Sequence, residues 1–183
     1  MIDATRKTAD DVLSFLREAG WEKWFVKDSQ FDADLRDRFV DLHHAAARRE
    51  CEDWIETADG ALSLMILLDQ FPRNVFRGTG HMFATDPLAR MYARMAIERG
   101  HDKAFDKMLA GFFYLPFEHS EDLADQKLSV RLFSALGEPW VKYADEHLEI
   151  IERFGRFPHR NPVLGRTSTA EELAFLADGG FAG

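Results

Sequence analysis

Residues 85–100 read TDPLARMYARMAIERG and carry the signals of a helix at both ends. Thr85 or Asp86 can serve as N-cap, and Pro87 suits the first helical position because it has no N–H to leave without a partner. Gly100 follows the last apolar residue, where a left-handed C-terminal residue is common. The stretch predicts one helix, and similar signals recur along the whole chain.

Seven other segments space their apolar residues by three and four, which is typical of helices that bury one face. They are 10–20, 32–46, 60–70, 103–115, 120–136, 139–155 and 168–176. No segment alternates with period two for long enough to predict a strand. We therefore predict an all-α fold of about eight helices, paired as antiparallel hairpins in a compact array.

Three details refine this prediction. Segment 60–70 is apolar nearly all round, which indicates a central helix. Pro72 and Pro116 are expected to end the helices that precede them, because proline lacks a backbone N–H and its ring clashes with the preceding turn. Ser120 is the expected N-cap of the segment that follows, and a capping box is expected at Ser168 or Thr169.

Length and composition set broad limits on function. The 183 residues, 46% hydrophobic and 30% charged, predict a single globular domain spanning 1–183. The net charge of -9 argues against a nucleic-acid partner, and no apolar run is long enough for a membrane span. The lone Cys51 cannot form an internal disulfide, and the polar start lacks the pattern of a secretory leader, so we expect a cytoplasmic protein. The oligomeric state cannot be derived.

Two corners of the chain resemble each other. QFPRN at 70–74 and RFPHRN at 156–161 both follow a long apolar helix with Phe-Pro, then Arg and Asn. Such residues can stop a helix and bind its exposed carbonyls, so the echo has a purely structural interpretation. The alternative is that the two corners face each other.

The second corner belongs to a basic stretch, and an acidic stretch precedes it. Segment 153–166 contains four arginines and no acid, whereas 117–126 contains four acids and no basic residue other than His119. Attraction between them would fix helix order, with Arg156, Arg160 and Arg166 pairing with acids of 117–126. This ion-pair network would belong to a structural or protein-interaction module.

Under the functional interpretation we expect these groups to lie around one cavity. A guanidinium is suited to such a site because it binds carboxylate or phosphate through two parallel hydrogen bonds. The predicted partner is a small anionic molecule or an acidic peptide. The candidate ligand-binding residues are Asp69, Arg73, Asn74, Arg77, Arg156, Arg160, Asn161 and Arg166. An alternative is hydrolytic or transfer chemistry, with His119 or His159 as general base, Glu118 or Glu121 as its orienting carboxylate, and Arg160 stabilising negative charge.

A metal centre would add His147 as a third ligand to His119 and His159. Neither a His-Glu-x-x-His motif nor a pair of Glu-x-x-His helices is present, and His147 lies on an apolar stripe. We expect it to be a packed, hydrogen-bonded residue, and we predict neither metal nor cofactor.

Four stretches carry a family resemblance: LLDQFPRNVFRGT, FATDPLA, YLPFEHSEDLADQ and RFGRFPHRNPVLGRTSTAEELAFL. Together they resemble a bacterial family known as domain of unknown function 924, over residues 24–176. The resemblance implies an all-α fold of antiparallel helix pairs similar to tetratricopeptide arrays, and it implies no known activity. The 34-residue tetratricopeptide period itself is absent, so peptide binding does not follow from it.

Overall fold

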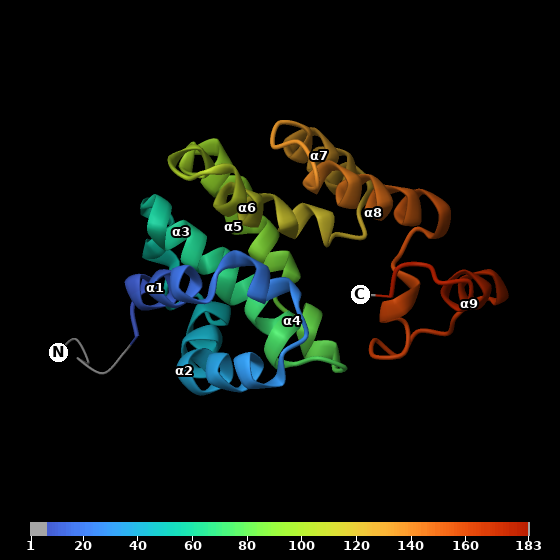
Figure 1. The fold of residues 1–183 in the computed structure, drawn as a ribbon, viewed down its shortest axis with the longest axis horizontal. Helices are drawn as coiled ribbons and strands as arrows, with labels where there is room; N and C mark the ends of the chain where they lie inside the picture. Colours follow the sequence, from blue (N-terminus) through green and yellow to red (C-terminus); the bar gives the residue numbers. More distant parts are fainter. Residues whose placement is uncertain (1–6, 183) are drawn as a thin grey trace. The chain divides into compact units, whose positions relative to one another are not determined.

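A computed structural model describes residues 7–182; residues 1–6, where the polar start of the chain begins, and residue 183 lie outside the described part. Every regular element in the described part is helical, which confirms the all-α prediction (Figure 1). None of these helices is long and apolar enough to cross a bilayer. The α-helices are α1 (Ala9–Ala19), α2 (Ser29–Ala47), α3 (Ala58–Met65), α4 (Phe71–Val75), α5 (Asp86–Glu98), α6 (Lys107–Glu118), α7 (Leu123–Ser134), α8 (Trp140–Phe154) and α9 (Ala170–Ala177).

Shorter elements connect them. A π-helical segment, η3 (Ile66–Gln70), joins α3 to α4. The 3₁₀ turns are η1 (Trp21–Phe25), η2 (Glu52–Glu56), η4 (Gly80–Phe83), η5 (His101–Ala104) and η6 (Pro158–Arg160). The described chain divides into two compact units, a first of 7–77 and 81–116 and a second of 78–80 and 117–182. That 1–183 acts as a single domain stays a prediction.

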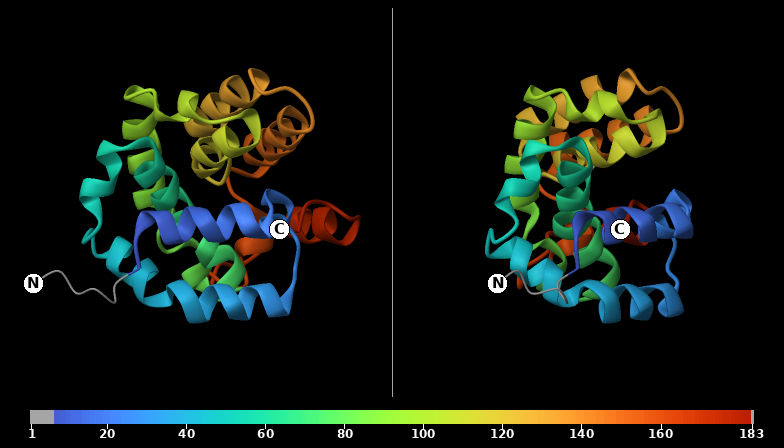
Figure 2. Two further views of the ribbon diagram at one scale, coloured as in Figure 1. Left: turned by 60° about the vertical axis from the view of Figure 1, so that its left-hand side comes forward. Right: turned by 90° about the vertical axis from the view of Figure 1, so that its left-hand side faces the viewer.

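The first two helices begin and end as local sequence chemistry directs. Thr8 caps α1 through a capping box with Asp11, and Gly20 ends it. Asp28 caps α2 by accepting hydrogen bonds from the amides of Gln30 and Phe31. In the first unit, α3 lies against α1 and α5, whereas α2 lies against η3 and α4 (Figures 1 and 2). Every residue from Gly60 to Pro72 is buried, which confirms a central helix.

Pro72 does not end the helix that precedes it, so that prediction was wrong. The helix widens into the π segment, where the amide of Phe71 bonds the carbonyl of Ile66 five residues back, and it continues as α4. Pro72 has no amide hydrogen, so it leaves without a partner either the carbonyl of Leu68, in an α pattern, or that of Leu67, in a π pattern.

Side chains form hydrogen bonds with the backbone carbonyls of this segment. Leu67 O lies 2.8 Å from His43 Nδ1, and Leu68 O accepts from the Thr85 hydroxyl at 2.6 Å. Asp69 O accepts from Arg73 Nη1 at 2.8 Å, and Gln70 O from Asn74 Nδ2 at 3.1 Å. The helix passes through a proline because residues from α2, α4 and the start of α5 supply these hydrogen bonds.

Two further helix ends differ from expectation. Helix α6 continues through Pro116 to Glu118, and Gln126 Nε2 fixes its end by donating to the carbonyls of Glu118 and Ser120, each at 2.6 Å. Helix α7 is capped by Asp122, which accepts from two backbone amides. Ser120 instead accepts from the amide of Asp122 and donates to Asp125.

The remaining helices follow the predicted signals. Helix α5 has Thr85 at its N-cap and is followed by Gly100 at a φ of 75°, while α8 ends at Gly155 at a φ of 67°. Helices α7 and α8 form a hairpin in the second unit (Figure 1). Thr169 and Glu172 form the capping box of α9.

Candidate functional site

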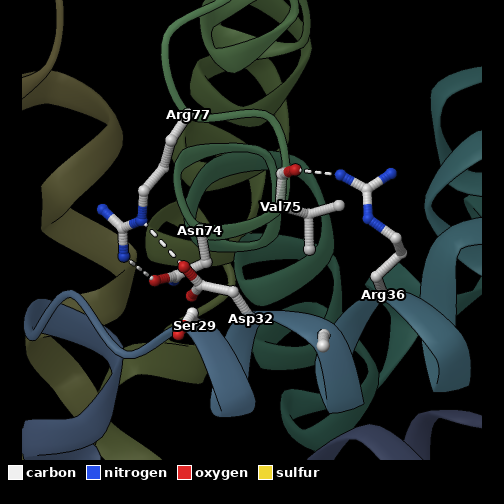
Figure 3. A pocket seen from close by; sticks show the side chains of 7 residues that line it. Ser29, Asp32, Arg36, Asn74, Val75 and Arg77 are labelled. Atoms are coloured by element: carbon white, nitrogen blue, oxygen red, sulfur yellow. Dashed lines mark hydrogen bonds and ion pairs between the residues drawn. The ribbon is translucent and has the colours of Figure 1, made fainter.

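A pocket of about 300 Å³ lies in the first unit, between the start of α2 and the end of α4 (Figure 3). Four polar side chains reach it: two are basic, one is acidic and one is an amide. The hydroxyl of Ser29, at the first position of α2, also lines it. The lining residues are Ser29, Asp32, Ala33, Arg36, Asn74, Val75 and Arg77. Two of them, Asn74 and Arg77, are among the predicted ligand-binding residues.

Arg77 is held at one side of the pocket by two neighbours. Its Nε lies 3.0 Å from Asp32 Oδ2, and its Nη2 donates to Asn74 Oδ1 at 2.5 Å. Asn74 is buried and is itself fixed, because its Nδ2 donates to the carbonyls of Trp24 and Gln70. The guanidinium plane of Arg77 is therefore oriented by groups from α2 and α4.

Arg36 lies on the other side of Val75 and was missed at the sequence level (Figure 3). Its Nη2 donates to the carbonyl of Val75, and its guanidinium carbon lies 5.2 Å from the centre of the Phe76 ring. Within the described residues, Arg36 Nε and Nη1 and Arg77 Nη1 donate to no other residue. These N–H groups are available to a bound molecule.

Asp69 and Arg73, also predicted to bind a ligand, take part in a buried ion-pair network. Arg73 contacts both oxygens of Asp86, at 2.9 and 3.0 Å, and its Nη1 lies 3.2 Å from Asp69 Oδ1. Asp69 is fully buried and also accepts from Gln70. These contacts hold α4 against the start of α5, and direct contact of Asp69 and Arg73 with a ligand stays a prediction.

A cluster of three histidines lies in the same unit and has no counterpart among the sequence predictions. His43 and His44 come from α2, and His81 comes from η4. Their ring nitrogens lie within 4.8 Å of one another, and we call them the histidine cluster. His43 is fully buried, and burial lowers its pKa to about 4; burial also lowers the pKa of the half-buried His81.

The second unit brings the acidic turn and the basic stretch together. Arg166 forms a two-pronged pair with Glu121, at 2.7 and 2.9 Å, and the amide of Phe157 donates to Glu121 at 2.8 Å. Burial alone would raise the pKa of Glu121, but the hydrogen bonds from Arg166 and the amide lower it below the usual value. Asn161 accepts from Arg166 Nε at 2.9 Å, so the predicted residues of this corner contact one another.

Arg156 pairs with an acid that the sequence prediction did not name. It contacts both oxygens of Glu172 on α9, at 2.6 and 2.8 Å, rather than an acid of 117–126. Asn161 and the amide of Thr169 also donate to Glu172. The hydrogen bond from Arg156, with these further contacts, lowers the pKa of Glu172 to about 2. Asp125 accepts a hydrogen bond from the Ser120 hydroxyl at 2.8 Å.

Three of the predicted catalytic residues, Glu118, His119 and His159, lie in the second unit near His147, whereas Glu121 pairs with Arg166. His147 is buried, lies 2.8 Å from the carbonyl of Tyr143 through Nδ1, and lies 3.9 Å from Glu118 Oε1. Its ring centre is 6.4 Å from that of His119. Burial lowers the pKa of His147 to about 3, and positive charge on His119, Arg160 and His159 acts in the same direction. His147 is thus the packed, hydrogen-bonded residue that was expected.

The predicted site residues are therefore distributed over the two units. Those from Asp69 to Arg77 gather in the first unit, and those from Glu118 to Arg166 gather in the second. Arginines of each corner pair with acids of the same unit. That both corners share one cavity stays a prediction.

The chain is all-helical over the described residues, and comparison with known proteins identifies its family. A family described as bacterial protein of unknown function, DUF924, matches residues 12–180, and the chain belongs to this family. The solved structure of the protein of unknown function ATU0120 from Agrobacterium tumefaciens is similar, at 55% identity and a TM-score of 0.92. The match covers 93% of this chain and 97% of that one. No curated protein matches the chain.

Proposed function

We propose that the protein binds a small anionic molecule in the pocket between α2 and α4, through Arg36 and Arg77. One observation carries the proposal: two arginines line the same pocket with guanidinium N–H groups that no described residue occupies. Such N–H groups bind carboxylate or phosphate oxygens with geometric as well as electrostatic preference.

The charges around the pocket favour a negatively charged ligand. Arg36 and Arg77 contribute two positive charges, and Asp32, which is paired with Arg77, contributes one negative charge. The pocket also lies at the N-terminal end of the 19-residue helix α2, where the helix dipole favours negative charge. Asp32 and Asn74 hold Arg77 in place before a ligand arrives, which reduces the entropy lost on binding.

The volume limits the class of ligand. A pocket of about 300 Å³ lies at the lower end of the range for small-molecule sites, so it suits a metabolite that carries one or two carboxylates or a phosphate. An acidic side chain of a peptide offers the same chemistry in a larger partner. The two sources can be separated by testing free metabolites and short acidic peptides side by side.

The test is a binding screen by thermal shift, followed by calorimetry, over phosphorylated and carboxylated metabolites and glutamate-rich peptides. We expect one class to stabilise the wild type, and Arg36→Gln and Arg77→Gln each to weaken its binding at least about fivefold. Arg99→Gln is the matched control, because Arg99 is a surface arginine paired with Glu56 outside the pocket. If no anion stabilises the wild type more than the double variant, the proposal fails, and the interpretation as a structural module gains support.

The same screen tests the wider prediction that both corners share one ligand. In that case Arg160→Gln, in the second unit, weakens binding as much as Arg77→Gln does. If only the α2–α4 variants weaken binding, the ligand site consists of the first corner alone.

Catalysis at the second corner is a second candidate, favoured by the group around His147. Glu118 Oε1 lies 3.9 Å from His147, and His119 and His159 are close enough for their charges to affect its pKa. If hydrolysis of phosphate or carboxylate esters is detected, one of the variants His119→Asn and His159→Asn, the one that removes the general base, should abolish turnover. Turnover that both variants retain would remove these histidines from the reaction.

A further inference from the structure

The histidine cluster offers chemistry that neither the anion pocket nor the ion-pair networks use. Three imidazoles, His43, His44 and His81, lie with their ring nitrogens within 4.8 Å of one another. Among residues 7–182, no other group of three or more histidine, cysteine or acidic side chains meets this distance. We propose that the cluster binds a divalent transition-metal ion of the zinc type, with one nitrogen ligand from each histidine.

The hydrogen bond of His43 to the backbone settles which of its nitrogens is available. Its Nδ1 lies 2.8 Å from the carbonyl oxygen of Leu67, which can only accept, so Nδ1 carries the proton. The lone pair is then on Nε2, which faces His81 Nε2 at 3.0 Å. A backbone carbonyl on the far nitrogen is a common means of orienting a metal-binding histidine.

The π segment explains why that carbonyl is present. Leu67 belongs to η3, where Pro72 and the wider turn leave carbonyls to side-chain donors. His43 uses one of them, and the ring is further held by stacking on Phe71, with centroids 4.9 Å apart. The first ligand is therefore fixed in position before any ion binds, which lowers the cost of forming the site.

The spacing of one pair of nitrogens, those of His43 and His81, is close to that of a zinc site. Two nitrogens bound to a tetrahedral zinc at about 2.0–2.1 Å are about 3.3 Å apart, and His43 and His81 need to separate by only a few tenths of an ångström to reach this value. His44 is half-buried, so its ring has room to turn towards the other two. Three imidazoles leave a fourth coordination position for water or an anion.

Aromatic packing defines the walls of the cluster. The Phe76 ring lies 4.0 Å from the His81 ring, centroid to centroid, and 5.6 Å from that of His43. These contacts cover the cluster on one side and limit the rotation of His81. Without an ion, a hydrogen bond from His81 Nε2 to His43 Nε2 satisfies the same pair of nitrogens.

The experiment uses the full chain without an affinity tag, freed of metal with a chelator and then titrated with Co²⁺ and Zn²⁺. Visible absorption reports the coordination of Co²⁺, and calorimetry gives the stoichiometry and affinity for Zn²⁺. We expect one equivalent of each ion to bind, and His44→Gln and His81→Gln each to weaken binding at least about tenfold. Circular dichroism confirms that the variants fold.

His101→Gln is the matched control, because His101 is a half-buried histidine of the same unit whose Nε2 lies 3.0 Å from the carbonyl of Ile55. It should bind both ions like the wild type. The proposal is overturned if the wild type binds neither ion at about 100 μM, or if either cluster variant binds as tightly as the control. The buried His43 is left unchanged, since its loss would also remove a hydrogen bond to the helix.

Discussion

The hydroxyl of Thr85 donates a hydrogen bond of 2.6 Å to the carbonyl of Leu68, one of the two groups that Pro72 can leave without a helical partner. Thr85 is the N-cap residue of α5, yet its side chain makes no capping hydrogen bond. It serves the neighbouring helix instead, and it joins α5 to the π segment that positions Asp69, Arg73 and Asn74.

Replacing Thr85 by valine therefore tests the π segment without removing a helix cap. Valine has nearly the same shape but no donor, so the buried carbonyl of Leu68 loses its partner. We expect Thr85→Val to lower the free energy of unfolding by about 1–3 kcal/mol, measured with urea. Thr85→Ser keeps the hydroxyl and should retain most of the stability. A loss of stability in Thr85→Ser but not in Thr85→Val would show that the methyl group, not the hydrogen bond, matters.

The pair formed by Glu121 and Arg166 should contribute more than an exposed pair of the same unit. Glu121 accepts from Arg166 twice and from the amide of Phe157, and its side chain is 28% exposed. We expect Glu121→Gln to cost about 1–2 kcal/mol in urea unfolding. Glu171→Gln, in a pair with Arg153 that is largely exposed, should cost less than about 0.5 kcal/mol. A reversed order would contradict this assignment.

Acid should weaken the second unit through Glu172. Because Arg156 lowers the folded-state pKa of Glu172 to about 2, below the ordinary value of 4.5, the unfolded chain takes up this proton first. The stabilisation is complete above pH 4.5 and is lost as the pH falls towards 2. The difference in unfolding free energy between wild type and Glu172→Gln should be largest at neutral pH and shrink through this range. A difference independent of pH would contradict the prediction.

Gly60 should tolerate no side chain. A Cβ atom at this position would lie 2.2 Å from the carbonyl oxygen of Trp54 and 2.9 Å from Thr57 Oγ1, the N-cap group of α3. We expect Gly60→Ala to lower the unfolding free energy by about 2–3 kcal/mol, because backbone must move to make room. Asp59→Ala, at an exposed neighbouring position, should change it by less than about 1 kcal/mol.

The parts of the fold that could be predicted depend on local chemistry. Thr169 and Glu172 lie three residues apart, so their capping box is visible in the sequence, as is the stop of α8 at Gly155. The continuation through Pro72 was not predictable in the same way. It depends on donors from His43 and Thr85, which lie 24 and 17 residues from the carbonyls that they serve.

The candidate sites, too, could be predicted only where their residues are close together in the sequence. Asn74 and Arg77 could be predicted as pocket residues because they belong to one short sequence motif. Arg36 also lines the pocket, but nothing in the sequence of its helix distinguishes it from an ordinary exposed arginine. His43 and His81 are 38 residues apart and match no metal-binding spacing. The adjacent histidines at 43 and 44 were the only local signal, and two neighbouring helical residues point in directions about 100° apart.

The π segment also sets the rotational phase of everything that follows it on the same helix. In a π-helix an amide bonds the carbonyl five residues back, whereas in an α-helix it bonds the carbonyl four residues back. The segment Ile66–Gln70 therefore contains, in effect, one inserted residue. If the same residues were wound as a regular α-helix without the π segment, α4 would be turned by about 100° relative to α3. Asn74 would leave its place beside Arg77, and Arg73 would swing away from Asp86, so one residue of length decides which side of α4 the pocket is built on.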